Sequence, residues 1–139
     1  CPTGATSQRA EDGIVTVDAR KCIGCRYCMM ACPYRQRFYL SYNPPKKTYF
    51  PAGPTPYELM GRKLRSYPAG TVVKCDFCVA SGRLDKGLEP ACVATCTAKA
   101  RTFGDLDNPE SEVSRLITYH GGFQLLAEKG TDPSIYYIR

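Results

Sequence analysis

A run of four cysteines near the start of the chain constrains its fold more than any other feature. It reads C-x-x-C-x-x-C-x-x-x-C-P and consists of Cys22, Cys25, Cys28, Cys32 and Pro33. Gaps of two residues place successive cysteine sulfur atoms on the same side of the backbone. Three thiolates of one short loop can therefore reach three irons of a [4Fe-4S] cube. The fourth cysteine then points to a neighbouring cluster, and the proline ends the local helix. The run therefore predicts iron-sulfur ligation suited to electron transfer.

A second run follows with wider spacing, C-x2-C-x13-C-x3-C. It consists of Cys75, Cys78, Cys92 and Cys96, and has a loop inserted between its second and third ligands. Cys1 is left over, and it heads the string CPTGA, which repeats the Cys-Pro ending of the first run. Cys1 is therefore interpreted as the fourth cysteine of another run, and we expect the chain to be the C-terminal part of a longer polypeptide.

Ligand exchange between runs predicts how the nine cysteines are shared. In two-cluster ferredoxins the first three cysteines of a run hold one cluster and the fourth reaches the other. The complete site predicted in this chain consists of Cys1, Cys22, Cys25 and Cys28. A second cluster, with its fourth ligand upstream, would be held by Cys75, Cys78 and Cys92. Clusters held mainly by the missing N-terminal part would receive Cys32 and Cys96.

Two other uses of cysteine compete with this interpretation. A structural zinc site uses four thiolates in two close pairs, which the wider run could supply if it stood alone. A disulfide framework suits secreted chains, but tight three-cysteine turns are poor disulfide geometry and nine is an odd number. Both alternatives are weaker than iron-sulfur ligation.

The charge and composition narrow the function classes. Lys and Arg number 19 against 13 Asp and Glu, a formal net charge of +6. This excess does not predict nucleic-acid binding, because the basic residues are spread out and a cluster with four thiolates adds negative charge that the count omits. No stretch approaches the roughly 20 apolar residues of a membrane span. No nucleophile with an adjacent base is evident, so a non-catalytic role is expected.

Local patterns place a few elements. Residues 13–18 contain the β-branched residues 14–17 and are bounded by Asp12-Gly13 and Arg20-Lys21, which predicts a short strand before the cluster loop. Met29, Met30 and Ala31 are expected on a helix between the third and fourth cysteines, shielding the cluster. Residues 101–106 are predicted as a strand that leaves the last run, equivalent to the chain after Cys1.

The C-terminal part is expected to form a helix and a tail. Asn108-Pro109-Glu110 has the residue types of a helix start, and Gly121-Gly122 those of a helix end. His120 would lie at the C-terminal end of this helix in a structural role. Residues 134–138 could form a last strand or a docking tail.

Four domains are expected along the chain. Residues 1–40 and 75–107 would each form half of a ferredoxin-like unit, residues 41–74 an insert, and residues 108–139 a C-terminal helix and tail.

The insert at 41–74 differs from the rest of the chain. It is rich in proline and aromatic residues and shows no sustained helical or strand period. A loop of this length inside a compact domain is usually functional or disordered, and the aromatic residues argue against disorder. We expect it to pack on a partner subunit, with packing on its own domain as the alternative.

The chain resembles the four-cluster iron-sulfur subunit of the molybdopterin oxidoreductases. The resemblance rests on the strings CPTGAT, CIGCRYCMMACPY, KCDFC, DKGLEPACVATC and ARTFGDLDNP. That family includes the electron-transfer subunits of dimethyl sulfoxide, polysulfide, thiosulfate, tetrathionate and respiratory arsenate reductases. The resemblance covers nearly the whole chain outside the insert. It implies an α+β fold of duplicated ferredoxin-like units, with small β-hairpins and short helices around [4Fe-4S] clusters. It also implies sixteen ligands and four clusters in the full-length protein.

The resemblance also implies the function and partners. The chain would relay single electrons between a molybdopterin catalytic subunit and a membrane quinone-interacting subunit, in a membrane-associated complex on the extracytoplasmic side. A free-standing polyferredoxin and a zinc-stabilised interaction module are the alternatives. Two residues depart from the family pattern: Cys96 is followed by Thr97-Ala98-Lys99-Ala100 in place of Pro-x-Gly-Ala, and Arg35 stands where glycine is common.

Overall fold

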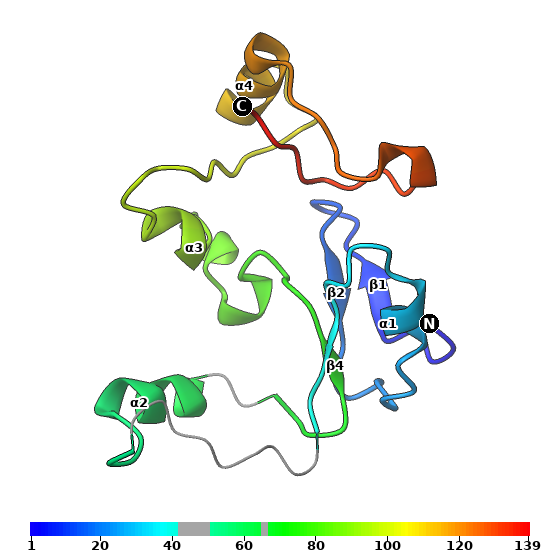
Figure 1. The fold of residues 1–139 in the computed structure, drawn as a ribbon, viewed down its shortest axis with the longest axis vertical. Helices are drawn as coiled ribbons and strands as arrows, with labels where there is room; N and C mark the ends of the chain where they lie inside the picture. The colour runs from blue at the N-terminus through cyan, green and yellow to red at the C-terminus, as the bar shows by residue number, and fades with distance from the viewer. Residues whose placement is uncertain (42–50, 65–66) are drawn as a thin grey trace. The chain divides into compact units, whose positions relative to one another are not determined.

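The structure is a computed structural model that describes residues 1–41, 51–64 and 67–139, and residues 61–64 by their backbone alone. The chain divides into two compact units, unit 1 (Cys1–Asp76) and unit 2 (Phe77–Arg139). Figure 1 shows short helices and strands joined by long irregular segments. The small hairpins and helices agree with the expected α+β class.

Unit 1 contains two antiparallel hairpins. Strand β1 (Thr6–Gln8) pairs with β2 (Val15–Val17), with Thr6 opposite Val17. Strand β3 (Phe38–Tyr39) pairs with β4 (Val72–Val73), and this pairing brings the two ends of the insert together. The strand predicted within residues 13–18 is confirmed as β2. The turn before β2 is formed at Asp12-Gly13, where the Asp12 carboxylate accepts from the Ile14 N–H at 3.0 Å.

Helix α1 (Tyr27–Ala31) contains Cys28, the third cysteine of the first run, and ends just before the fourth, so Met29, Met30 and Ala31 lie on a helix as predicted. Its N-cap Arg26 has a left-handed backbone, with φ of 62°. Met29 is half-buried, but the side chain of Met30 is 76% exposed. Ala31 is exposed as well, so the prediction that this whole apolar segment is shielding fails for Met30 and Ala31, because a single helical turn cannot point three consecutive side chains inward.

The insert contains a helix that its sequence was not expected to form. Helix α2 (Pro56–Leu64) begins with a capping box, in which the Thr55 N–H donates to Glu58 Oε2 at 2.7 Å and the Glu58 N–H donates to Thr55 Oγ1 at 3.3 Å. Pro56 occupies the first helical position, where no N–H is needed. The side chains of Tyr57, Leu59 and Met60 are exposed. Docking of this insert on a partner stays a prediction, and residues 42–50 and 65–66 lie outside the described part.

Unit 2 consists of short helices and irregular chain. These are the 3-10 helices η1 (Val79–Ser81), η2 (Leu84–Lys86) and η3 (Ala127–Lys129), with α3 (Ala91–Ala94) and α4 (Glu112–His120). Gly121 ends α4 as predicted, in a left-handed conformation with its N–H on the Ile117 carbonyl. His120 lies in the last turn of α4, as expected. Within residues 134–138 the structure forms only a bridge, between Phe123 and Tyr137.

Two expectations for unit 2 are wrong. Helix α4 begins after Ser111, whose hydroxyl accepts from the Ser114 N–H at 3.3 Å, and not at Asn108, whose side chain closes a turn onto the Glu110 N–H. The segment 101–106 is irregular and not a strand. The α4 region holds it: Ser111 Oγ donates to the Asp105 carbonyl at 2.6 Å, and Gly104 packs closely on Val113.

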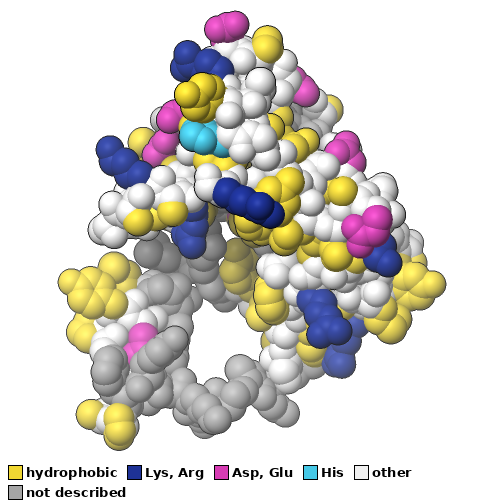
Figure 2. All heavy atoms as spheres, turned by 45° about the horizontal axis from the view of Figure 1, so that its top comes forward, with side chains coloured by type: hydrophobic (Ala, Val, Ile, Leu, Met, Phe, Trp, Pro, Cys, Tyr) yellow, Lys and Arg dark blue, Asp and Glu magenta, His cyan; other side chains and the backbone are white. Residues whose placement is uncertain are grey.

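Few side chains are buried in either unit. The buried apolar residues of the described chain are Ala5, Val72, Pro90 and Val113. Figure 2 accordingly shows hydrophobic side chains at many places on the visible surface. In the described ranges, no helix combines the length and apolar character needed to cross a membrane. The protein side chains alone therefore provide only a small interior.

Candidate iron-sulfur cluster sites

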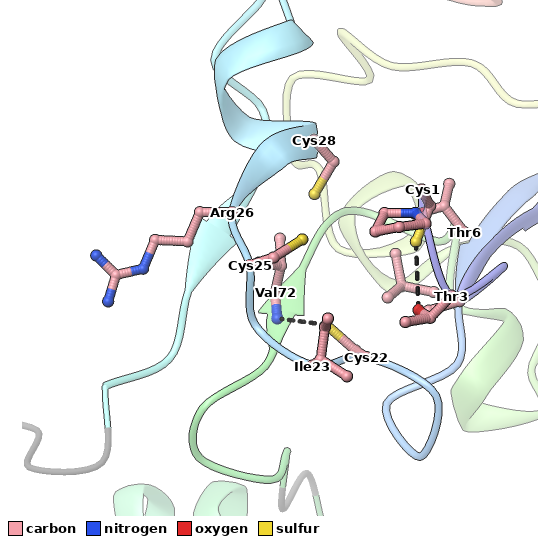
Figure 3. Close-up of a pocket in the computed structure, with 12 residues that line it drawn as sticks. Cys1, Thr3, Thr6, Cys22, Ile23, Cys25, Arg26, Cys28 and Val72 are labelled. Carbon is pink, nitrogen blue, oxygen red and sulfur yellow. Dashed lines mark hydrogen bonds between the residues drawn. The ribbon is translucent and has the colours of Figure 1, made fainter.

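Four cysteines surround one pocket of unit 1, and one of them, Cys1, is distant in sequence from the other three. Cys1 precedes β1, while Cys22, Cys25 and Cys28 come from the loop before α1 and its first turn. Figure 3 shows the sulfur atoms of Cys1, Cys25 and Cys28 pointing toward a common space, with the Cys22 sulfur at its edge. The empty space in this pocket is about 330 Å³, including open solvent at its mouth. These are the four residues predicted from the cysteine runs to form one complete site.

The loop between these cysteines depends on two left-handed residues. Gly24 has φ of 67° and Arg26 φ of 62°. A Cβ at Gly24 would overlap the Gly70 carbonyl oxygen and lie 3.1 Å from a ring carbon of Tyr39, so only glycine fits. The Arg26 side chain points away from the pocket (Figure 3), and its guanidinium stacks 3.8 Å from the centre of the Tyr39 ring. The cluster loop is thus packed against the β3–β4 hairpin.

A backbone N–H and a side-chain hydroxyl contact two of the sulfur atoms. The Val72 N–H on β4 donates to Cys22 Sγ at 3.4 Å, and Cys1 Sγ lies 3.6 Å from Thr3 Oγ1. The rest of the lining is mainly apolar, with Ala5, Val17 and Ile23 among its residues, and it also includes Thr3, Thr6 and Arg26. Hydrogen bonds to a thiolate favour its charged, metal-binding form, and an apolar lining keeps water away. The chemistry of this donor set therefore fits a thiolate-bound cluster.

The second run presents similar contacts, but the boundary between the units divides it. Cys75 belongs to unit 1, whereas Cys78 and Cys92 belong to unit 2. Within unit 2 the Ala91 N–H donates to Cys78 Sγ at 3.4 Å, as expected of a ligand sulfur. The arrangement of Cys75, Cys78 and Cys92 around one cluster stays a prediction. In the described ranges, no group of three or more Cys, His, Asp or Glu side chains is placed to hold a single metal ion.

The fourth cysteines share one exit turn. The N–H three residues after the cysteine donates to the cysteine carbonyl, at 3.2 Å from Gly4 to Cys1, 3.3 Å from Arg35 to Cys32 and 3.0 Å from Lys99 to Cys96. The donor residue is left-handed in each turn, with φ of 66°, 53° and 48° respectively. Arg35 and Lys99, the two departures from the family pattern, thus adopt the left-handed backbone that glycine favours. This conformation destabilises the fold by about 1–2 kcal/mol at each residue. In the last turn the Ala100 N–H also donates to Cys96 Sγ at 3.3 Å.

Replacing Lys99 by glycine is expected to stabilise the cluster-loaded protein. Glycine adopts this φ without the Cβ clash, which should raise the midpoint of anaerobic thermal unfolding by roughly 2–4 °C. Lys99→Ala is the matched control, because it removes the charge but keeps the Cβ. An equal gain in Lys99→Ala would show that charge, and not backbone strain, limits stability at this turn.

Two basic residues lie near the cysteine pocket of unit 1. Arg37 Nη1 donates to Thr6 Oγ1 at 3.1 Å, and Lys74 Nζ donates to the carbonyl oxygens of Val15 and Cys75. Both side chains are half-buried. Burial lowers the pKa of Lys74 below its usual range; the Cys75 thiol opposes this shift, and the Arg37 guanidinium adds to it.

Sequence reasoning missed several residues that build the site. Val72 and Ala91 contribute through their backbone N–H groups, which no residue type signals. Gly24 had an available signal, because a glycine between two ligands of a tight loop suggests a positive φ or a close approach of backbone. Arg37 and Thr6 are 31 positions apart, and their contact requires the fold.

Two family models match the chain. The first describes a 4Fe-4S binding domain and covers residues 14–38, which include the first cysteine run. The second describes a 4Fe-4S dicluster domain and covers residues 52–106, which include the second run. The fold and the cysteine sites thus define a [4Fe-4S] protein with ferredoxin-type domains. The chain uses [4Fe-4S] clusters as its cofactors, and the zinc interpretation is disfavoured.

Curated relatives match over nearly the whole chain. A Halobacterium salinarum protein assigned as the iron-sulfur subunit of a dimethyl sulfoxide reductase is 49% identical over 138 residues, covering 99% of this chain and 48% of the relative. A selenate reductase subunit of Mesobacillus selenatarsenatis is 42% identical, covering 99% and 49%. The arsenate respiratory reductase iron-sulfur subunit ArrB of Shewanella sp. is 40% identical, covering 100% and 68%.

The chain belongs to the family of [4Fe-4S] iron-sulfur subunits of molybdopterin oxidoreductases. The resemblance stated from the cysteine strings is therefore confirmed. The chain spans about half the length of the first two relatives and about two thirds of the third.

Proposed function

We propose that this chain is part of an electron-transfer subunit that relays single electrons through a row of [4Fe-4S] clusters. The observation that carries the proposal is the pocket lined by Cys1, Cys22, Cys25 and Cys28. A cluster bound there would supply one-electron transfer without bond breaking. The protein would hold its position through four thiolates, exclude water with apolar side chains, and donate the Val72 N–H to a ligand sulfur.

The remaining cysteines extend this proposal to further clusters. Cys75, Cys78 and Cys92 would hold a second cluster with a ligand from upstream, and Cys32 and Cys96 would serve clusters held mainly by that upstream part. The shared exit turn after Cys1, Cys32 and Cys96 supports a duplicated ferredoxin-like architecture. The full-length protein would then contain four clusters.

The partners are proposed from the family. Relatives named as subunits of dimethyl sulfoxide, selenate, arsenate and tetrathionate reductases support a catalytic partner for this chain. We assign that partner to the molybdopterin class and the other neighbour to a quinone-interacting membrane subunit, in a membrane-associated complex on the extracytoplasmic side. A free-standing polyferredoxin is the alternative function, since it would use the same cysteines without a large partner.

Metal analysis of the anaerobically purified full-length protein tests this function. We expect iron and acid-labile sulfide in equal amounts, about sixteen of each per chain for four clusters. Molybdenum in the same preparation would support the catalytic partner, whereas full iron in a protein that purifies alone would support the polyferredoxin. Zinc without sulfide would contradict electron transfer.

A further inference from the structure

Two half-buried cations lie where the two hairpins of unit 1 meet. Arg37 immediately precedes β3 and Lys74 immediately follows β4, so both belong to the same hairpin. Each reaches across to the other hairpin: Arg37 Nη1 donates to Thr6 Oγ1 of β1 at 3.1 Å, and Lys74 Nζ donates to the Val15 carbonyl of β2. The two cations thus join the hairpins through neutral oxygen atoms.

Neither cation forms an ion pair with a carboxylate in the part of the chain that the structure describes. Other arginines of unit 1 do so: Arg9 lies 3.0 Å from Glu11, and Arg20 lies 3.4 Å from Asp18. Partial burial of a cation is costly unless nearby negative charge compensates it, and like charges close together add to the cost. The Arg37 charge opposes that of Lys74, whereas Cys75 and Asp76, which follow Lys74 in the chain, attract it.

The cysteine pocket lies next to this pair. Thr6, which accepts from Arg37, lines the pocket together with the four cysteines. Val72 of β4 also lines it and lies two residues before Lys74, which follows that strand. Four thiolates around a [4Fe-4S] core carry net negative charge, which would compensate the two cations. The pair is therefore placed where it can act on the charge of a bound cluster.

We propose that Arg37 and Lys74 set the reduction potential of the cluster at Cys1, Cys22, Cys25 and Cys28 by stabilising its reduced form, an inference that rests on the proposed function of that site. Reduction adds one electron from the redox partner to the site, and no bond breaks and no proton moves. The negative charge of the site increases by one, so its attraction to both cations increases. Partial burial strengthens this attraction, because the local dielectric constant is lower than that of water.

The test is an anaerobic redox titration of the full-length protein in its complex, with dithionite as reductant and electron paramagnetic resonance as readout. Cys25→Ser first identifies the signal that belongs to this site. Arg37→Gln and Lys74→Met should then each lower the equilibrium constant for reduction of that cluster about tenfold, which is a fall of about 59 mV for one electron. The other clusters should shift less in Arg37→Gln, whereas Lys74→Met should also shift the cluster at Cys75, because Lys74 Nζ donates to the Cys75 carbonyl. Arg20→Gln is the matched control: it removes an exposed, carboxylate-paired cation close to Cys22, and should leave the potential nearly unchanged.

The charge-conserving variants Arg37→Lys and Lys74→Arg complete the test. Potentials near that of the unaltered protein in these variants, with lowered potentials in the neutral ones, would support the inference. Unchanged potentials in both neutral variants at full iron content would overturn it. If the neutral variants lose the cluster, its retention in the charge-conserving pair supports charge compensation, and its loss in all four overturns it. A Cys25→Ser protein with every cluster signal intact would instead refute the site assignment itself, and this inference with it.

Discussion

Replacing Gly24 by alanine is expected to remove one [4Fe-4S] cluster from the protein. The added methyl group would overlap the Gly70 carbonyl oxygen and contact the Tyr39 ring, in a backbone with φ of 67°. The Tyr39 ring could shift, but the Gly70 carbonyl is backbone and cannot yield without separating the cluster loop from the β3–β4 hairpin, which also provides the Val72 N–H to Cys22. Iron and sulfide analysis should show a loss of about four of each per chain.

Gly4→Ala is the matched control for this prediction. Gly4 has φ of 66°, almost the same strain, but nothing lies within 4 Å of its Cβ position. It also lies near the same site, three residues after Cys1. We expect a cost of about 1–2 kcal/mol from the backbone alone, with normal iron content. Equal iron loss in both variants would show that φ, and not the contact with Gly70, determines cluster binding.

Removing the clusters is expected to unfold most of the chain. The buried apolar side chains of the described residues are few, namely Ala5, Val72, Pro90 and Val113. The strands of unit 1 are two or three residues long, and isolated hairpins of this size are marginal in water. Metal ligation must therefore contribute much of the folding free energy, as in other small metal domains.

Thermal unfolding followed by circular dichroism checks this prediction. Anaerobically chelated full-length protein should show no cooperative transition, and the transition should return after reconstitution with iron and sulfide. The untreated protein, carried through the same steps without chelator, is the control. A cooperative melt of the metal-free protein would mean that protein packing alone suffices to hold the fold.

The parts that sequence reasoning predicted correctly are those with short-range signals. Cysteine spacing and the Cys-Pro endings indicated [4Fe-4S] ligation, and local residue types indicated β2, α1 and the end of α4 at Gly121. The capping box at Thr55 and Glu58 was also a local signal, but the many prolines around it concealed α2. The expected strand at 101–106 failed because side chains of the α4 region occupy its carbonyls, at Asp105 for example.

The parts that could not be predicted depend on contacts between distant residues. The Val72 N–H reaches Cys22 across 50 positions, and Lys74 reaches Val15 across 59. A backbone donor can be any residue type other than proline, so no pattern marks it in advance. The same holds for the packing of Gly24 on Gly70, which becomes visible only when the hairpin is in place.

The β3–β4 hairpin separates the cysteine pocket of unit 1 from the segment between Leu40 and Gly70. The Leu40 N–H donates to the Thr71 carbonyl at 2.8 Å, and the Gly70 N–H donates to the Leu40 carbonyl at 2.6 Å, so the chain departs and returns at one hydrogen-bonded point. The entropy of closing a loop grows only slowly with length, by about 0.6 kcal/mol for each doubling. Evolution can therefore lengthen, shorten or rewrite the segment between these residues with little effect on the cysteine pocket. The same point offers protein engineers a place to graft a foreign recognition segment beside a redox centre.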